Sequence, residues 1–297
     1  MTTTEPAKPA PELSVVVPVF NEADVIGVVV ERTVEYLEGR GIDYELNLID
    51  DGSRDSTAVV VGRACGTNPR VRFFRHDCNR GYGAALRTGI RAARGRRILV
   101  SDGDGQFAIE DLGRLWERRD DADMVLGFRS PRQDPWFRRL AGWVWSRIVV
   151  RFALGGRYRD VNCGFKLIAR EVTEGMSLAS EGALVSAEIL TRAARRGASY
   201  VEVGVTHTRR GQGKATGFLP RVVWRAFREL RRYRRVIVAS SGVLERATNL
   251  PATNDAIESP TLRQAKVAEL ADAQDSGSCG RKAVGVQVPP FAPPAAP

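Results

Sequence analysis

Short apolar runs alternate with amphipathic segments along the first part of the chain. The runs predict buried strands at residues 13–19, 45–49, 71–74, 97–100 and 124–127. Apolar positions spaced by three or four predict helices at residues 22–38, 55–64, 84–93 and 109–118. Because strands alternate with helices, we expect an α/β fold with a mostly parallel central sheet flanked by helices.

The pattern changes after Gly127. A helix over 184–195 and a strand over 200–205 continue the α/β pattern, but two basic helices flank them. Residues 136–154 are apolar on almost every side and carry Trp and Arg, which suits a helix at a membrane surface. Residues 219–238 place apolar residues on one face and arginines on the opposite face, which predicts a surface helix or a membrane-docking helix.

Composition excludes several classes of protein. The 297 residues are 43% hydrophobic and 27% charged, a globular balance that rules out a wholly disordered chain, a collagen and a coiled coil. Four widely spaced cysteines argue against a disulfide scaffold and a zinc module. Residues 1–12 lack the apolar core of a signal peptide, and we expect them to form a flexible tail. No apolar run approaches the roughly 18 residues that a spanning helix needs.

Positive charge is concentrated late in the folded part. The formal net charge is +10, and residues 205–238 hold ten Lys or Arg against one acid. Such a face predicts an anionic partner, either phosphates or an anionic membrane surface. Nucleic acid is the less favoured partner, because no recognised nucleic-acid-binding motif accompanies the charge.

The last segment, residues 241–297, has no periodicity and ends rich in proline, so we expect a disordered tail. Residues 267–293 look like a bacterial tRNA gene read through as protein, with codons that can form the arms of a leucine tRNA. On that hypothesis the tail's composition says nothing about function. The predicted domain is therefore residues 13–240.

Polar clusters follow the predicted strands at residues 21–22, 50–53 and 102–106, where parallel sheets bind their ligands. Asp102 and Asp104, two residues apart in a glycine turn, need a counter-charge, which a divalent cation would supply. Oxygen ligands suit Mg²⁺ or Mn²⁺, and Gln106 is a candidate third ligand. Each cluster taken alone is better explained as an ordinary turn or helix cap.

Together these clusters resemble a known family. The segments that carry the resemblance are VVVPVFNE, LIDDGSRDST, NRGYGAALRTGIRAARG, SDGDGQF and DMVLGFR, in this order. They closely resemble the family 2 inverting glycosyltransferases of the GT-A fold, and within them the dolichol-phosphate or polyprenyl-phosphate mannosyltransferase type. The resemblance covers about residues 13–240.

The resemblance implies roles for residues of the nucleotide half. It implies that Pro18, Glu22 and Asp51 contact the nucleoside and that Gly81 lies in a loop close to the diphosphate. It also implies that Asp102, Asp104 and Gln106 surround the metal, with Asp104 counted among the catalytic residues.

For the acceptor half, the resemblance implies that Arg129 and Arg139 hold the acceptor phosphate and that Asp160 orients the acceptor or the substrate. Lys166 stands where the family usually has Arg. The segment HTRRGQGKAT, residues 207–216, resembles a phosphate-binding loop in which Arg210 and Lys214 are the candidate ligands. Ala215 and Thr216 stand where that loop usually has Ser and Lys, so the resemblance does not imply the usual phosphate contacts at these two positions.

The implied function is transfer of a hexose from a nucleotide sugar, of the GDP-mannose or UDP-glucose type, to a polyprenyl phosphate. We expect a cytoplasmic protein on the inner face of the cell membrane. Two alternatives remain open: a family 2 transferase with a soluble acceptor, and a non-catalytic basic protein that binds membrane or RNA. The sequence leaves the oligomeric state open.

Overall fold

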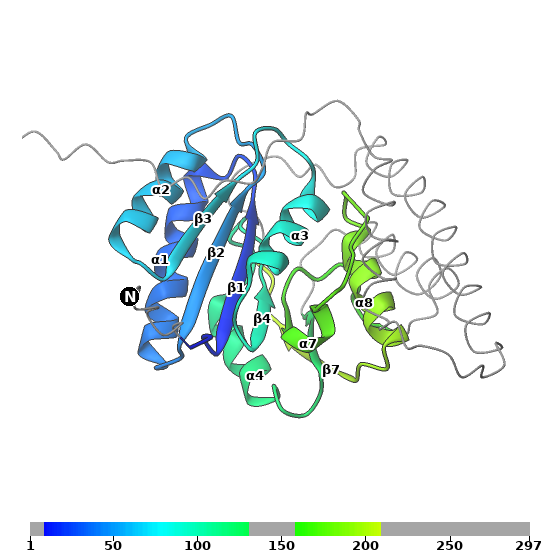
Figure 1. Cartoon of the computed structure of the whole chain (residues 1–297). Helices are drawn as coiled ribbons and strands as arrows, with labels where there is room; N and C mark the ends of the chain where they lie inside the picture. The colour runs from blue at the N-terminus through cyan, green and yellow to red at the C-terminus, as the bar shows by residue number, and fades with distance from the viewer. Residues whose placement is uncertain (1–8, 131–157, 209–297) are drawn as a thin grey trace, which may run out of the picture.

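A computed structural model describes residues 9–130 and 158–208, which fold around a seven-stranded sheet (Figure 1). The strand order is β3-β2-β1-β4-β6-β5-β7. The strands are β1 (Leu13–Val19), β2 (Tyr44–Asp50), β3 (Val71–Arg75), β4 (Arg97–Val100), β5 (Met124–Arg129), β6 (Lys166–Ala169) and β7 (Tyr200–Val205). The helices are α1 (Ala23–Gly39), α2 (Thr57–Thr67), α3 (Tyr82–Ala92), the 3₁₀ turn η1 (Ile109–Asp111), α4 (Leu112–Glu117), α7 (Arg170–Thr173) and α8 (Val185–Arg195).

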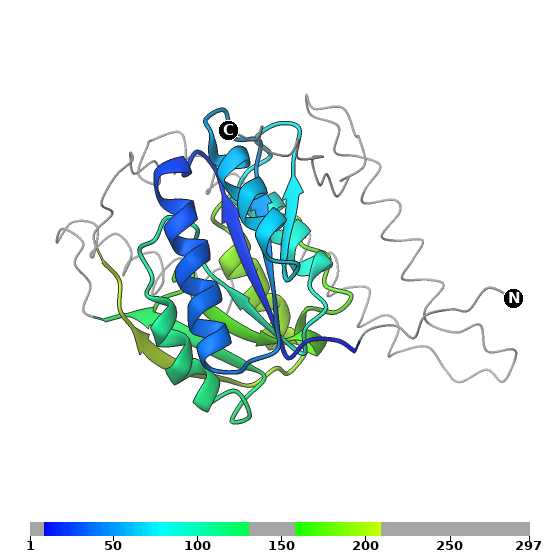
Figure 2. The same ribbon diagram turned by 90° about the vertical axis from the view of Figure 1, so that its left-hand side faces the viewer.

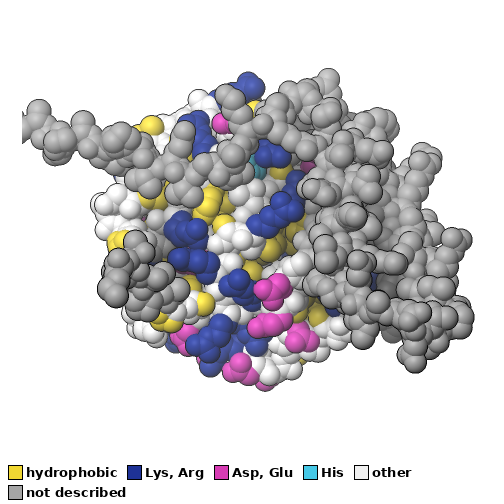
Figure 3. Space-filling view, viewed as in Figure 1, with side chains coloured by type: hydrophobic (Ala, Val, Ile, Leu, Met, Phe, Trp, Pro, Cys, Tyr) yellow, Lys and Arg dark blue, Asp and Glu magenta, His cyan; other side chains and the backbone are white. Residues whose placement is uncertain are grey.

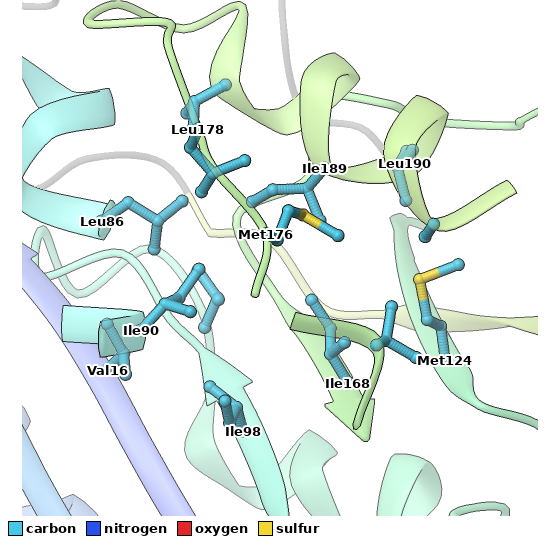
Figure 4. Close-up of a cluster of buried hydrophobic side chains, with 14 of the residues drawn as sticks. Val16, Leu86, Ile90, Ile98, Met124, Ile168, Met176, Leu178, Ile189 and Leu190 are labelled. Atoms are coloured by element: carbon cyan, nitrogen blue, oxygen red, sulfur yellow. The ribbon is translucent and has the colours of Figure 1, made fainter. Parts of the chain in front are cut away.

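Helices cover both faces of the sheet, as the continuous burial of β1 and β2 requires. On one face, α1, α2 and α4 pack against the sheet, with Ile26, Val61 and Leu112 among the buried residues (Figure 2). On the other face, α3, α7 and α8 pack against Val16, Ile98 and their neighbours (Figure 4). The fold therefore has three layers, and the expected α/β architecture is confirmed.

Strand β6 is the exception in a mostly parallel sheet. It pairs antiparallel with both β4 and β5, whereas β1, β2, β3 and β4 pair in parallel with their other neighbours and β5 pairs in parallel with β7. Because β6 runs the opposite way, its first residue, Lys166, pairs with Val100 at the end of β4 and with Leu126 on β5. The beginning of β6 thus lies at the sheet edge where the parallel strands end.

The observed elements match the apolar pattern to within a few residues at most ends. Helix α2 begins at Thr57, where the Asp55 carboxylate accepts hydrogen bonds from the Thr57 N–H at 3.0 Å and from its hydroxyl at 2.6 Å. The sequence did not predict β6 or α7.

The predicted basic helices at 136–154 and 219–238, and the tail at 241–297, lie outside the described residues. Among the residues that are described, no helix is both long and apolar enough to cross a membrane.

One buried carboxylate, Glu45 on β2, ties the sheet together at the end opposite the polar clusters. It accepts hydrogen bonds from the Ser14 hydroxyl at 2.7 Å, from the Arg94 N–H at 2.7 Å and from Arg72 Nη1 at 3.0 Å. Burial acts to raise the pKa of Glu45, but the donors from Ser14 and Arg94 outweigh it, so the pKa lies below its usual value. The ionised carboxylate therefore stabilises the folded state.

We predict that Glu45→Gln lowers the free energy of unfolding by about 2 kcal/mol at pH 7, because the donors lose a charged acceptor. A lowered pKa contributes stability above the unfolded-state value, roughly 4.3, and this contribution disappears as pH falls through the folded-state value. Urea unfolding at several pH values should therefore show the wild-type advantage shrinking in acid. Glu31→Gln, at an exposed position of α1, is the control. An advantage that is independent of pH would contradict this account.

Candidate functional site

The loops that follow β1 and β2 are bound to each other. Asn21 adopts a positive φ of 55°, a conformation that Asn tolerates better than most residues. Its N–H donates to the Ser53 hydroxyl at 2.9 Å, and its side-chain oxygen accepts the Arg54 N–H at 2.9 Å. Glu22 follows as the N-terminal flanking residue of α1, and its N–H donates to the Thr57 hydroxyl at 2.9 Å. The two loops thus form one rigid rim at the sheet edge.

Two predicted nucleoside-binding residues lie at different depths in this region. Pro18 is buried within β1, where it pairs with Ile49 of β2, whereas Glu22 lies on the rim itself. Phe20, between them, is 39% exposed at the end of β1. The nucleoside contacts of Pro18 and Glu22 stay predictions, and Glu22 has the more accessible position.

Asp51, at the end of β2, is a buried carboxylate that holds the loop before α3. Its Oδ1 accepts the Arg80 N–H at 2.9 Å and its Oδ2 accepts the Gly81 N–H at 2.7 Å. The His76 Nδ1 lies 2.7 Å from the same Oδ1, and His76 Nε2 lies 3.0 Å from the Thr88 hydroxyl on α3. Asp51 therefore has a structural role, and its nucleoside contact stays a prediction. The Gly81 N–H donates to Asp51, and the predicted closeness of Gly81 to a diphosphate also stays a prediction.

Gly81 itself must be glycine. Its φ is 98°, and a Cβ there would lie 2.4 Å from the carbonyl oxygen of Glu181. The Gly83 N–H donates to that same carbonyl at 2.7 Å. The beginning of α3 is thus fixed from two sides, by Asp51 at the end of β2 and by the loop that precedes α8.

The Asp102 carboxylate, directly beyond β4, is held between two neighbours. The Tyr82 hydroxyl donates to its Oδ1 at 2.8 Å, and a Cβ on Gly164 would lie 2.0 Å from its Oδ2. Removal from water raises the pKa of Asp102 to about 6, and the neighbouring charge of Asp104 adds to the rise. A divalent cation would stabilise the ionised form of Asp102 beside a second carboxylate.

Asp104 and Gln106 continue the same turn. Asp104 Oδ1 accepts the Gln106 N–H at 3.1 Å, and the Gln106 side-chain amide donates to the Thr208 carbonyl at 2.9 Å. Phe107 pairs with His207 as an isolated bridge, with ring centroids 5.1 Å apart. The first residues of the predicted phosphate-binding loop therefore lie beside the Asp-x-Asp turn.

The residues present fit Mg²⁺ or Mn²⁺ in part. Asp102 and Asp104 supply carboxylates at one turn, and the role of Gln106 as a third ligand stays a prediction. Within residues 9–130 and 158–208, no group of three or more His, Cys, Asp or Glu side chains forms a complete metal site. With these two carboxylates as ligands, substrate phosphates and water would complete the coordination of a bound Mg²⁺, as is usual for that ion.

An ion pair and a buried lysine lie next to this turn. Arg129, at the end of β5, contacts Asp160 through Nε–Oδ2 at 2.7 Å and Nη2–Oδ1 at 2.9 Å. Lys166 at the start of β6 donates to the Cys163 carbonyl, and its charge acts on both Asp102 and Asp160. Burial lowers the pKa of Lys166, while those carboxylates oppose the change. The structure thus brings the predicted metal residues and the predicted acceptor residues Arg129 and Asp160 together.

Arginines also lie outside the site. On the face shown in Figure 3, Lys and Arg side chains are spread over the described surface, and acidic side chains gather toward its lower edge. Three arginines near the ends of α3 are exposed: Arg80 before its first residue, Arg91 in its last turn and Arg94 after its last residue. The predicted ligands Arg139, Arg210 and Lys214 lie outside the described residues.

Sequence reasoning missed three residues that shape the site: His76, Tyr82 and Gly164. Tyr82 stands inside a motif that the sequence singles out, and Gly164 lies between Asp160 and Lys166, but nothing in the sequence pairs either of them with Asp102. His76 follows β3, whose neighbour in the sheet is β2, so the strand order alone would bring it near Asp51.

The fold and the site define a three-layer α/β domain with carboxylates at the sheet edge where the parallel strands end. The chain belongs to glycosyl transferase family 2, whose family model matches residues 14–176. It is 31% identical over 206 residues to the undecaprenyl-phosphate 4-deoxy-4-formamido-L-arabinose transferase of Edwardsiella ictaluri (strain 93-146). The match covers 68% of this chain and 62% of that relative.

Solved structures share the fold. Glucosyl-3-phosphoglycerate synthase from Mycobacterium tuberculosis, in complex with Mg²⁺ and uridine diphosphate, superposes with a TM-score of 0.59 at 18% identity, covering 75% of this chain and 79% of that chain. Mannosyl-3-phosphoglycerate synthase from Rubrobacter xylanophilus superposes with a TM-score of 0.53 at 17% identity, covering 85% and 80%. These similarities confirm the predicted GT-A fold.

We predict that Gly164→Ala disables the site without unfolding the protein. The new Cβ would lie 2.0 Å from Asp102 Oδ2, so the carboxylate must move. Mn²⁺ binding in the presence of a nucleoside diphosphate, measured by the loss of the free Mn²⁺ electron paramagnetic resonance signal, should weaken at least tenfold. Gly175→Ala is the control, because a Cβ there would meet no atom within 4 Å, although its positive φ of 64° costs some stability. Wild-type Mn²⁺ affinity in Gly164→Ala would refute the assignment of Asp102.

Proposed function

We propose that this chain transfers a hexose from a nucleotide sugar to a polyprenyl phosphate at a membrane surface, with inversion at the anomeric carbon. The observation that carries the proposal is the proximity of the Asp102–Asp104 turn to the Arg129–Asp160 pair and Lys166. Carboxylates for a cation and cations for a phosphate are the two groups that such a transfer needs. Family membership and the named activity of the Edwardsiella relative support transfer of a sugar to a polyprenyl phosphate, although the sugar named for that relative is an arabinose derivative.

In the proposed reaction, an oxygen of the acceptor phosphate attacks the anomeric carbon and forms a new C–O bond. The bond from that carbon to the β-phosphate oxygen breaks, and the nucleoside diphosphate leaves with the electron pair. A phosphate monoester, whose second pKa is roughly 6, is mostly ionised at neutral pH, so it needs no strong general base. A bound Mg²⁺ or Mn²⁺ would neutralise charge on the leaving diphosphate.

The chain's own residues supply binding and orientation in this scheme. Asp102 and Asp104 would hold the cation, and the rim around Glu22 and Asp51 would hold the nucleoside. Arg129 is already oriented by its paired contacts with Asp160, so its guanidinium has little freedom left to lose when an acceptor phosphate binds. Asp160 therefore acts in this proposal as a positioning group rather than as a base.

The membrane part of the proposal depends on sequence alone. The Trp- and Arg-rich segment 136–154 and the basic segment 219–238 support docking at the inner face of the cell membrane. A soluble acceptor remains the alternative within the family. The nucleotide, the sugar and the lipid length are left to experiment.

The function is tested with a panel of donors and acceptors. Purified protein is incubated with Mn²⁺ and with GDP-mannose, UDP-glucose or a UDP-activated L-arabinose derivative, each combined with undecaprenyl phosphate or 3-phosphoglycerate. We expect one donor to give a glycolipid with undecaprenyl phosphate, and Asp104→Ala to give none while its melting temperature stays close to wild type. Transfer to 3-phosphoglycerate alone would favour the soluble-acceptor alternative. The absence of both nucleotide binding and Mn²⁺ binding would favour a non-catalytic protein.

We predict that Arg139→Ala raises the KM for lipid phosphate about tenfold to a hundredfold, because a charge-assisted hydrogen bond contributes about 1.5–3 kcal/mol. The KM for the nucleotide sugar should barely change. Arg139→Lys should recover only part of the loss, because Lys keeps the charge but not the planar fork. Steady-state kinetics with each substrate varied in turn measures both constants. A change in the KM for the nucleotide sugar alone would show that the acceptor site does not include Arg139.

A further inference from the structure

Tyr82 is the first residue of α3, and its hydroxyl reaches across to the carboxylate that follows β4. We propose that Tyr82 is a positioning residue that holds Asp102 in the orientation in which it binds the divalent cation. The inference rests on the metal site of the proposed function and goes beyond it, because Tyr82 itself would touch neither the cation nor the substrates.

The contact leaves Asp102 little rotational freedom. One carboxylate oxygen accepts the Tyr82 hydroxyl at 2.8 Å, and the carboxylate lies in the space that a Cβ on Gly164 would fill, with Oδ2 2.0 Å and Oδ1 2.5 Å from that Cβ position. Rotation of the carboxylate would break the hydrogen bond. The Asp102 carboxylate is therefore already oriented before a cation binds.

The Tyr82 hydroxyl donates its hydrogen to the Asp102 carboxylate. A donor to the ionised carboxylate also favours the charged form that a cation requires.

Hydrogen bonds also fix the backbone that leads into Tyr82. The two residues before it, Arg80 and Gly81, donate their N–H groups to the Asp51 carboxylate, and His76 Nδ1 contacts the same carboxylate. Its ring also packs against the apolar cluster of Figure 4. The chain of contacts runs from the end of β2 through the start of α3 to the end of β4, so the nucleotide-binding rim and the metal carboxylate share one support.

The test is Tyr82→Phe, which keeps the ring and removes only the hydroxyl. Partners of metal-ligating groups typically change metal affinity by roughly 10- to 100-fold when removed. We expect that loss in the Mn²⁺ dissociation constant, read from the free Mn²⁺ resonance signal with excess GDP or UDP present. The binding stoichiometry reports the folded fraction, so a loss of folded protein is separated from a loss of affinity.

The matched control is Tyr36→Phe, a tyrosine near the far end of α1 whose hydroxyl donates to the Glu110 carbonyl. It should leave Mn²⁺ affinity unchanged. In the transfer assay, Tyr82→Phe should raise the Mn²⁺ concentration for half-activation by the same factor as the dissociation constant. Saturating Mn²⁺ should restore kcat to within about twofold of wild type, a rescue that a merely structural role would not give.

Wild-type Mn²⁺ affinity in Tyr82→Phe would overturn the inference, as would a fall in kcat that no Mn²⁺ concentration restores. Because the binding measurement uses no acceptor lipid, it decides the role of Tyr82 even where transfer to polyprenyl phosphate fails. Failure of transfer by a wild-type protein that binds Mn²⁺ and nucleotide would overturn the proposed function alone.

Discussion

The partly buried carboxylate of Asp102 is the constraint around which the rest of the site is arranged. Its pKa of about 6 reflects burial and the nearby charge of Asp104. Such a group needs compensation, and the fold supplies it from several elements: a hydroxyl from α3 and the more distant cations Lys166 on β6 and Arg129 on β5. A bound divalent cation would complete the compensation.

The antiparallel strand β6 makes this arrangement possible. In a purely parallel sheet, the segment that leads into a strand lies at the edge opposite the ligand site. Because β6 runs the other way between β4 and β5, the segment from Asp160 to Lys166 arrives at the same edge as Asp102 and Arg129. The charged groups that we propose for binding the donor and the acceptor are thus adjacent, although they are far apart along the chain.

Most of the fold could be predicted from the sequence, because β1 to β5 are apolar runs long enough to signal burial and the helices between them keep a regular apolar spacing. Strand β6 could not be predicted in this way. Like β4 it has only four residues and begins with a basic one, but the lysine of β6 is buried, which depends on neighbours from other strands. Its presence follows from pairing with β4 and β5, which no local pattern encodes.

The candidate site divides in the same way. Asp102, Asp104 and Arg129 are found from their motifs because each stands at the end of a predicted strand. The roles of Tyr82, His76 and Gly164 depend on contacts across 20, 25 and 62 positions of the chain, to Asp102, Asp51 and Asp102 respectively. Such contacts appear only when the strand order is known. For Asp51 the sequence indicated a nucleoside contact, and the structure adds a second role, that of holding the loop before α3.

The central claim is that Asp102 and Asp104 together bind the cation that holds a nucleoside diphosphate at this edge of the sheet. Crystals grown with Mn²⁺ and GDP or UDP, with data collected at the manganese absorption edge, test it most directly. The account predicts one anomalous peak within coordination distance of an Asp104 carboxylate oxygen and of the diphosphate, with the Asp102 carboxylate still against Gly164. A bound nucleotide with the manganese peak elsewhere, or with no peak, would contradict it.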